Sequence, residues 1–325
     1  MKFIEIFSGI GGMGYGLMKA GFECVGFCEV NKYAHAAFNL LHNSEKKMWE
    51  GWDIRDVTDE NIRSIKRERG EISLISGGFP CQSFSIAGSR RGFEDTRGTL
   101  IFEIFRFAFF LRPKYLLLEN VKGLISHDNG ETFKIILESL DELGYDAEWQ
   151  VLNSKNFDVK QNRERLFIVG HLRGSSGRKV FPFTRKSKMD IKIEGRLDVK
   201  GFDILKRVYS TDGISPTLNT SQGGSRVAKI ITKDSRIRYL TPLEYFRLQS
   251  FPDEWYQKLK DKKYSNTQLY KLAGNAVTPN VTEEIGKRLI IKEKKEYSDY
   301  WLNINKIIAN RMLEGIRKQL MEEAK

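Results

Sequence analysis

Cys81 is the residue of this sequence best placed to act as a nucleophile, because it follows a proline at the start of a loop-like segment. It lies in GGFPCQSFSIAG, residues 77–88, directly after the apolar run ISLIS. A buried structural thiol would be expected inside the apolar run. A thiol titrates near ~8.5 unless cationic neighbours lower its pKa, and only the thiolate is a strong nucleophile. The position therefore predicts nucleophilic catalysis, with a packed thiol as the alternative.

Three charged residues could support such a cysteine. Glu119 ends the apolar run KYLLLEN, and Arg163 and Arg165 lie two residues apart in QNRERLFIVG. Residues two apart in a strand project to the same side, so both arginines would face one site if a strand begins there. They could stabilise the thiolate or bind a substrate carbonyl, and Glu119 could donate a proton when neutral. Taken singly, a surface ion pair or solvated charges would explain each of them.

A glycine pattern after the first apolar run predicts a ligand-binding turn. Gly9, Gly11 and Gly14 satisfy G-x-G-x-x-G, and Glu29 follows Gly9 after twenty residues. Glycines let the backbone approach a ligand, and an acid at the end of the second strand can bind ribose hydroxyls. The pattern alone fits a dinucleotide, S-adenosylmethionine, or a tight turn that binds nothing.

Strand-like and helix-like segments alternate over the first 170 residues, which predicts an α/β fold with a doubly wound, mostly parallel sheet. Ligands bind beyond the carboxyl ends of the strands of such sheets, so Cys81, Glu119 and Asp53 (after KKMWEGW) would meet in one crevice. After residue 240 helical spacing returns, and LYKLAGNAVTPNVTEEIGKRL predicts a loop followed by a helix. Apolar runs predict strands at 2–7, 23–28, 71–76, 114–120, 147–152 and 165–170, and helical spacing predicts helices at 13–20, 31–41, 58–69, 99–111 and 131–143.

Composition and charge indicate a globular protein with a polyanionic partner. The 325 residues carry a net charge of +12, with 40% hydrophobic and 30% charged residues. Residues 171–240 hold sixteen lysines and arginines against six acids, which favours a nucleic-acid partner over a solvated lysine-rich insertion. Three cysteines form neither a disulfide framework nor a zinc pattern, which favours an intracellular protein without a metal. No apolar run approaches the length of a membrane span.

Seven ordered motifs resemble those of the cytosine carbon-5 DNA methyltransferases over nearly the whole chain. They are FSGIGG, PCQSFS, GFEDTRGTL, ENVKG, QNRERLFIVG, TPLEYFRLQSFP and GNAVTPNV. The resemblance implies the Rossmann-like fold of class I S-adenosylmethionine-dependent methyltransferases, in an enzyme of the bacterial or phage restriction-modification type. It implies a catalytic and cofactor domain over 1–171, a smaller basic target-recognition domain over 172–240 and a return segment over 241–291. Helical spacing in the tail predicts a helical extension over 292–325.

The implied reaction transfers a methyl group from S-adenosylmethionine to carbon-5 of a cytosine in a specific short duplex DNA sequence, leaving S-adenosylhomocysteine. Addition of the Cys81 thiolate at carbon-6, with Glu119 protonating ring N3, would make carbon-5 enamine-like. By resemblance, Arg165 would hold the cytosine carbonyl and Arg163 would support the nucleophile loop. Because carbon-6 is buried in the duplex, the cytosine must first rotate out of the stack, and we expect residues 82–99 to close over it.

The resemblance also assigns residues to the cofactor and to DNA. Phe7 would stack on the adenine, Glu29 and Asp53 would bind the ribose and the adenine amine, and Asn275 with Val277 would lie near the methionine part. The other cofactor-binding residues would be Gly9, Ile10, Gly11, Gly12, Val30, Ile54, Pro80 and Leu100. The expected DNA-binding residues are Ser85, Arg90, Arg91, Arg97, Arg185, Lys186, Lys188, Thr217, Asn219, Ser221, Gln222 and Arg226.

Three other interpretations stay open at this point. An NAD-dependent enzyme would share the glycine turn but gives no role to Cys81 or Glu119. An RNA cytosine methyltransferase could use the same catalytic motifs, and a non-catalytic DNA-binding relative could keep the fold. For the methyltransferase we expect double-stranded DNA as the partner and no membrane association. We also expect a monomer that is located in the bacterial cytoplasm and associated with the nucleoid. A paired restriction endonuclease is compatible with the resemblance, and the sequence does not reveal which DNA word is recognised.

Overall fold

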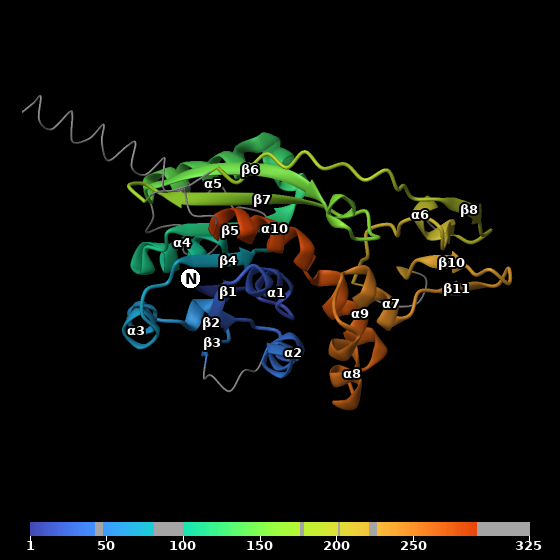
Figure 1. Cartoon of the computed structure of the whole chain (residues 1–325), viewed down its shortest axis with the longest axis horizontal. Coiled ribbons are helices and arrows are strands. Elements are labelled where there is room, and N and C mark those ends of the chain that lie inside the picture. Colours follow the sequence, from blue (N-terminus) through green and yellow to red (C-terminus); the bar gives the residue numbers. More distant parts are fainter. Residues whose placement is uncertain (43–47, 81–99, 176–178, 201, 221–225, 291–325) are drawn as a thin grey trace, which may run out of the picture. The chain divides into compact units, whose positions relative to one another are not determined.

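A seven-stranded, mostly parallel sheet positions the site, with the strand order β3-β2-β1-β4-β5-β7-β6 (Figure 1). The computed structural model describes residues 1–42, 48–80, 100–175, 179–200, 202–220 and 226–290. Strands β1 to β5 pair in parallel, and β7 is antiparallel to both β5 and β6. The strands are β1 (Lys2–Ile6), β2 (Glu23–Cys28), β3 (Trp49–Gly51), β4 (Leu74–Gly78), β5 (Tyr115–Val121), β6 (Tyr145–Asn153) and β7 (Glu164–Leu172).

The strand order reverses between β1 and β4, which is where ligands bind in open α/β sheets. The chain builds β1, β2 and β3 outward in one direction and then returns to place β4 on the other side of β1. The predicted doubly wound, mostly parallel sheet is confirmed. The pairing of β7 explains how residues at the start of one strand meet residues at the end of another, because antiparallel neighbours bring opposite ends together.

Helices cover both faces of this sheet. In β1, Ile4 and Ile6 belong to the large apolar core that also contains residues of α3, α4 and α5, whereas Phe3 and Glu5 lie against Gly14 of α1. The five predicted helices are confirmed with ends that differ by at most one residue. They are α1 (Gly12–Lys19), α2 (Lys32–His42), α3 (Asp59–Arg69), α4 (Leu100–Leu111) and α5 (Glu131–Glu142), with the 3₁₀ helices η1 (Ile54–Asp56), η3 (Lys122–Gly130) and η4 (Ser154–Phe157) between them.

A second sheet lies within the basic stretch 171–240. It has the strand order β11-β10-β9-β8, and none of its strands was predicted from the apolar runs. Its strands have only three or four residues, too few for a period-2 pattern to stand out in the sequence. The elements are β8 (Ile193–Arg196), α6 (Asp203–Lys206), β9 (Arg207–Ser210), β10 (Lys229–Ile231) and β11 (Ile237–Tyr239).

Four helices follow this second sheet: α7 (Pro242–Leu248), α8 (Asp253–Asp261), α9 (Asn266–Asn275) and α10 (Pro279–Ile290). The helix predicted at the end of LYKLAGNAVTPNVTEEIGKRL is confirmed as α10, but the loop predicted before it is limited to residues 276–278, because LYKLAGN forms the last seven residues of α9. A capping box of Ser265 and Gln268 starts that helix. Residues Met1–Leu289 form one compact unit and Ile290–Lys325 a second, so the predicted extension 292–325 lies outside the described residues. Within the described ranges, every helix is too short or too polar to cross a membrane.

Candidate active site

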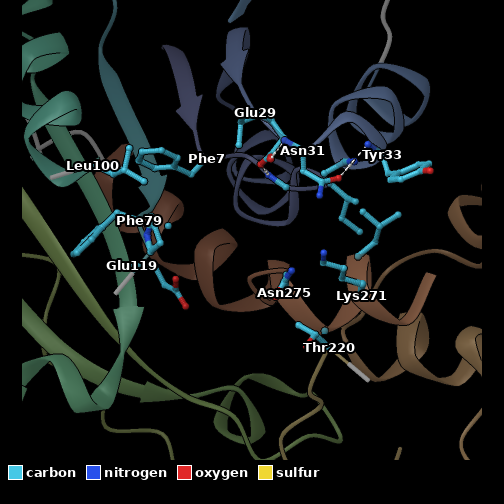
Figure 2. Close-up of a pocket in the computed structure, with 18 of the residues that line it drawn as sticks. Phe7, Glu29, Asn31, Tyr33, Phe79, Leu100, Glu119, Thr220, Lys271 and Asn275 are labelled. Atoms are coloured by element: carbon cyan, nitrogen blue, oxygen red, sulfur yellow. Dashed lines mark hydrogen bonds between the residues drawn. The ribbon is translucent and has the colours of Figure 1, made fainter. Parts of the chain in front are cut away.

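A cavity of about 1020 Å³ lies at the carboxyl ends of the central strands, and α9 and residues 217–220 form its opposite wall (Figure 2). Glu119, Arg163, Arg165, Thr217 and Asn219 line it, although they come from distant parts of the sequence. Pro80 also lines it, while the adjacent Cys81 lies outside the described residues. Ten of the predicted cofactor residues line the cavity: Phe7, Gly9, Ile10, Glu29, Val30, Asp53, Ile54, Pro80, Leu100 and Asn275.

The turn after β1 leaves space for a ligand beside a fixed carboxylate. Phe7 and Gly9 have φ values of 56° and 57°, in the left-handed region that glycine adopts most readily. A Cβ built on Gly9 would meet no atom within 4 Å, so this part of the turn is open. Glu29 accepts hydrogen bonds from the backbone N–H groups of Gly9 (2.8 Å) and Asn31 (2.7 Å), one on each oxygen. Each oxygen keeps a lone pair that can accept a hydroxyl.

Three predicted cofactor residues are absent from the cavity lining. A Cβ on Gly12 would lie 2.3 Å from the carbonyl oxygen of Val277, and one on Gly11 would lie 2.2 Å from Nε2 of His42. These glycines therefore allow α1 to pack closely against α2 and against the segment before α10. The structure gives Gly11, Gly12 and Val277 a packing role beside the ligand-facing turn.

Asp53 is oriented by its own neighbour in sequence. Its carboxylate accepts hydrogen bonds from the backbone N–H (3.0 Å) and Nε (2.9 Å) of Arg55. The hydrogen bonds from Arg55 lower the pKa of Asp53, so the carboxylate is charged at neutral pH. A charged carboxylate at the cavity wall suits an amine donor.

Glu119 and Arg165 form an ion pair at the end of β5. Val121 lies opposite Arg165 in the antiparallel pair, and Glu119 is two residues before Val121, so both side chains project from the same face of the sheet. Arg165 Nε lies 3.0 Å from Glu119 Oε1. Burial raises the pKa of Glu119, while the charges of Arg165 and Arg163 oppose that rise. The site therefore holds a carboxyl group that keeps its proton more readily than an exposed glutamate.

Arg163 has a different environment from Arg165, because β7 begins at Glu164 and Arg163 precedes it. Its side chain is almost completely buried and donates to the carbonyl oxygens of Leu218 (3.1 Å), Gly274 (3.0 Å) and Ala276 (3.1 Å). The guanidinium thus joins the stretch between β9 and β10 to the end of α9. Three carbonyl acceptors around one buried cation indicate a positioning role for Arg163.

The same junction is reinforced by residues beside Arg163. The backbone N–H of Asn162 donates to Ser215 (2.8 Å), and the N–H of Ser215 donates to Lys160 (2.9 Å). The fully buried Gln161 donates to the carbonyl oxygen of Leu248 (3.0 Å) and accepts from the N–H of Leu218 (3.2 Å). This buried polar junction, residues 160–163 with 215–218, fixes one wall of the cavity.

Sequence reasoning missed several residues of the site. Asn120 Nδ2 donates to the carbonyl oxygen of Phe79 (2.9 Å) and thereby fixes the chain two residues before Cys81. The only feature of the sequence that pointed to Asn120 was its position directly after Glu119 in ENVKG. Periodicity gave no signal for the other missed lining residues, which include Asn31, Tyr33, Trp52, Phe79, Thr220 and Lys271. Among the described side chains, no three His, Cys, Asp or Glu residues come together to hold a metal ion.

The predicted DNA-binding residues fall in different places. Thr217 and Asn219 line the main cavity, and Arg226 lines a smaller one beside the second sheet. Arg185 and Lys186 line a third cavity of about 660 Å³, and Arg185 lies 3.7 Å from Glu284 of α10. Lys188 is exposed. Outside the described residues lie Ser85, Arg90, Arg91, Arg97, Ser221 and Gln222.

Comparisons with known proteins agree with this geometry. A type II methyltransferase, M.Bsp6I of Bacillus sp. (strain RFL6), is 33% identical over 324 aligned residues, which cover 89% of this chain and 98% of the relative. The orphan methyltransferase M.SPRI of Bacillus phage SPR is 29% identical over 436 residues, covering 89% and 97%.

Two solved structures share the fold. A putative DNA modification methyltransferase encoded within an E. coli prophage has a TM-score of 0.66 at 19% identity, covering 89% of this chain and 98% of that one. The S. pombe Dnmt2 methyltransferase has a TM-score of 0.66 at 20% identity with the same coverage. The family model of the C-5 cytosine-specific DNA methylases matches residues 1–201 and 183–291. The chain therefore belongs to the family of C-5 cytosine-specific DNA methylases.

Proposed function

We propose that this DNA cytosine-5-methyltransferase acts on a cytosine rotated out of a specific short duplex sequence, through a covalent bond between Cys81 and carbon-6. The observation that carries the proposal is the buried Glu119 carboxyl, held by Arg165 in the same cavity as the glycine turn. A proton donor at this position suits cytosine chemistry, because ring N3 takes up a proton as carbon-6 is attacked. The family membership disfavours an NAD-dependent enzyme.

The cavity fits S-adenosylmethionine as the methyl donor. Its volume of about 1020 Å³ leaves room for the cofactor and a base together. The open space at Gly9 adjoins Glu29, whose free lone pairs suit ribose hydroxyls, and the charged Asp53 suits the adenine amine. When bound, S-adenosylmethionine supplies an electrophilic methyl group.

The protein's own residues activate the base. Carbon-5 of cytosine is a weak nucleophile, and the Cys81 thiolate adds to carbon-6 to give the ring enamine character. Glu119, whose pKa is raised by burial, delivers a proton to ring N3, which accepts the charge that develops during addition. Arg165 orients Glu119 and can donate to the cytosine carbonyl. Carbon-5 then takes the methyl group, which leaves S-adenosylhomocysteine, and loses its proton to water. N3 returns its proton to Glu119 as Cys81 leaves carbon-6 by β-elimination, so the free enzyme is restored.

Asn120 and Arg163 fix the positions of the backbone segments that carry these groups. Asn120 fixes the carbonyl of Phe79 just before the nucleophile, and Arg163 fixes the cavity wall that carries Leu218. Double-stranded DNA is the proposed partner, and the basic region 172–240 is proposed to recognise its sequence. We further propose a monomer in the bacterial cytoplasm near the nucleoid, with a restriction endonuclease as a functional partner.

Bisulfite sequencing of DNA from cells that express the protein tests the proposal. We expect methylated cytosines within one short sequence, and none in cells that express Cys81→Ser. A parallel assay with purified protein compares methyl incorporation into duplex DNA and into tRNA. Incorporation into tRNA alone would replace this proposal with RNA methylation. A duplex with 5-fluorocytosine at the target position should trap a covalent complex with the wild type, because fluorine cannot leave carbon-5 as a proton does.

A further inference from the structure

Four cationic side chains line the main cavity, and three of them are held by acceptors of the same chain. Arg55 pairs with Asp53, Arg165 pairs with Glu119, and Arg163 donates to three carbonyl oxygens. The fourth is Lys271, which is exposed to the cavity and makes neither an ion pair nor a hydrogen bond with any residue that the structure describes.

None of the carboxyl groups among the described lining residues pairs with Lys271. Asp53 and Glu119 pair with arginines, and Glu29 accepts backbone N–H groups. These three acids face four cations, so the cations exceed the acids by one, and by two where Glu119 carries its proton. A surplus cation in a binding cavity favours a ligand with an anionic oxygen group.

The helix that carries Lys271 is held firmly in place. Lys271 and Asn275 are four residues apart and project from one face of α9. Near the end of α9, Gly274 packs so closely that a Cβ there would lie 2.3 Å from the carbonyl oxygen of Asn219. A capping box fixes the other end of the helix. The ammonium group is therefore carried by a rigid element, which reduces the entropy lost when it binds a ligand.

Figure 2 shows where this charge lies relative to the rest of the cavity. Phe7 and Glu119 lie on one side of the view, Lys271 lies on the other, and Glu29 and Asn275 lie between them. A nucleoside with its ribose at Glu29 and its base toward the aromatic side would extend its remaining atoms toward α9. The amino-acid end of S-adenosylmethionine is that remainder, and it carries the only carboxylate of the molecule.

We propose that Lys271 binds the carboxylate of the methionine part of S-adenosylmethionine and so selects the intact cofactor over its decarboxylated form. This inference rests on the proposed function. The same anionic-oxygen chemistry could come from a DNA phosphate, because Thr220 and Asn219 border the same end of the cavity. The two sources predict different effects of the same substitution.

The test measures binding of S-adenosylhomocysteine and of its decarboxylated analogue by titration calorimetry. Lys271→Met keeps the length of the side chain and removes its charge. We expect it to weaken binding of S-adenosylhomocysteine by about 5- to 50-fold, the range for one charge-assisted hydrogen bond at a partly exposed site, and to leave binding of the analogue unchanged. Lys271→Arg should recover most of the lost affinity. Lys262→Met, which removes an exposed charge outside the cavity lining, is the matched control.

Three results would overturn the inference. Equal losses for both ligands, or no loss for either, would show that Lys271 does not contact the carboxylate. Unchanged S-adenosylhomocysteine binding with a slope of log DNA affinity against log salt flattened by about 0.9 would assign Lys271 to a phosphate instead. Failure of the proposed function is distinguishable, because it appears in the bisulfite and methyl-incorporation assays of the wild type, whereas this test compares the binding of two cofactor analogues.

Discussion

Replacing Glu119 by glutamine removes the acidic proton of the side chain and preserves its shape. Glutamine has the same size, and its amide oxygen can still accept the hydrogen bond that Arg165 Nε donates over 3.0 Å. It cannot deliver a proton to cytosine N3. Loss of general acid catalysis costs roughly 10²- to 10⁴-fold in rate, or about 2.7 to 5.5 kcal/mol of activation free energy. We expect a fall of this size in the single-turnover rate, with little change in DNA affinity.

The pH profile gives the sharper test. Burial raises the pKa of Glu119 above its usual value of 4.5, and the reaction uses the protonated form. The wild-type rate should therefore fall as pH rises through that pKa, and this decline should be absent in Glu119→Gln. Arg165→Met removes the positive charge that opposes the rise, so the pKa of Glu119 should increase further and the decline should move to higher pH.

The assay is rapid-quench transfer of a radiolabelled methyl group to a duplex at saturating enzyme and cofactor, over a range of pH. Circular dichroism and cofactor binding of each variant serve as controls for folding. A Glu119→Gln rate within threefold of the wild type, or an unchanged decline at high pH, would refute Glu119 as the proton donor. A decline that moves to lower pH in Arg165→Met would refute the electrostatic argument.

Three further predictions concern the nucleophile, the cavity wall and the basic surface. Cys81→Ser should abolish methyl transfer and keep cofactor binding, since serine is not ionised at neutral pH; near wild-type incorporation would remove Cys81 from the mechanism. Gly274→Ala forces the backbone of Asn219 to move, so the midpoint temperature of thermal unfolding should drop by several degrees and turnover should fall. Gly123→Ala is the control and should change neither quantity, because a Cβ at Gly123 meets no atom within 4 Å. Simultaneous substitution of Arg185, Lys186 and Lys188 by alanine should weaken DNA binding whatever the DNA sequence. It should flatten the slope of log DNA affinity against log salt concentration by about 0.9 per lost phosphate contact and leave turnover at saturating DNA unchanged. A loss of turnover with an unchanged slope would show that DNA binds to another surface.

Long periodic segments were predictable from the sequence because they bury a continuous apolar face. The helices over 100–111 and 131–142 were predicted to within a residue at each end. The three-residue β3 and the short strands of the second sheet were missed, because so few residues show no period. The second half of α9 was taken for a loop, since a glycine and an asparagine near its end resemble a turn more than a helix.

The candidate site was predictable where chemistry restricts the residue type. Glu119 and Arg165 could be paired from strand ends and motifs, and the structure brings them into contact. The glycine pattern could not distinguish Gly9, which faces open space, from Gly12, which packs on a carbonyl oxygen. A left-handed turn favours glycine, and so does a close packing contact, so both positions look alike in the sequence. Lys271 gave no signal at all, since the absence of a partner among the described residues is visible only when the partners of the neighbouring charges are known.

The buried polar junction, residues 160–163 with 215–218, has a consequence for how such an enzyme can change over evolution. It ties residues 160–163, which precede the second sheet, to residues 215–218 between β9 and β10, and Gln161 also donates to the carbonyl oxygen of Leu248 after β11, so the second sheet is held at fixed points before, within and after it. Lengthening a loop between fixed points costs little, about 0.6 kcal/mol for each doubling. The alignment with the phage SPR relative spans 436 positions, more than the 325 residues of this chain. If the basic region 172–240 recognises the DNA sequence as proposed, a lineage could change the recognised sequence by exchanging the segments between these points, while Glu119 and Arg165 stay in place.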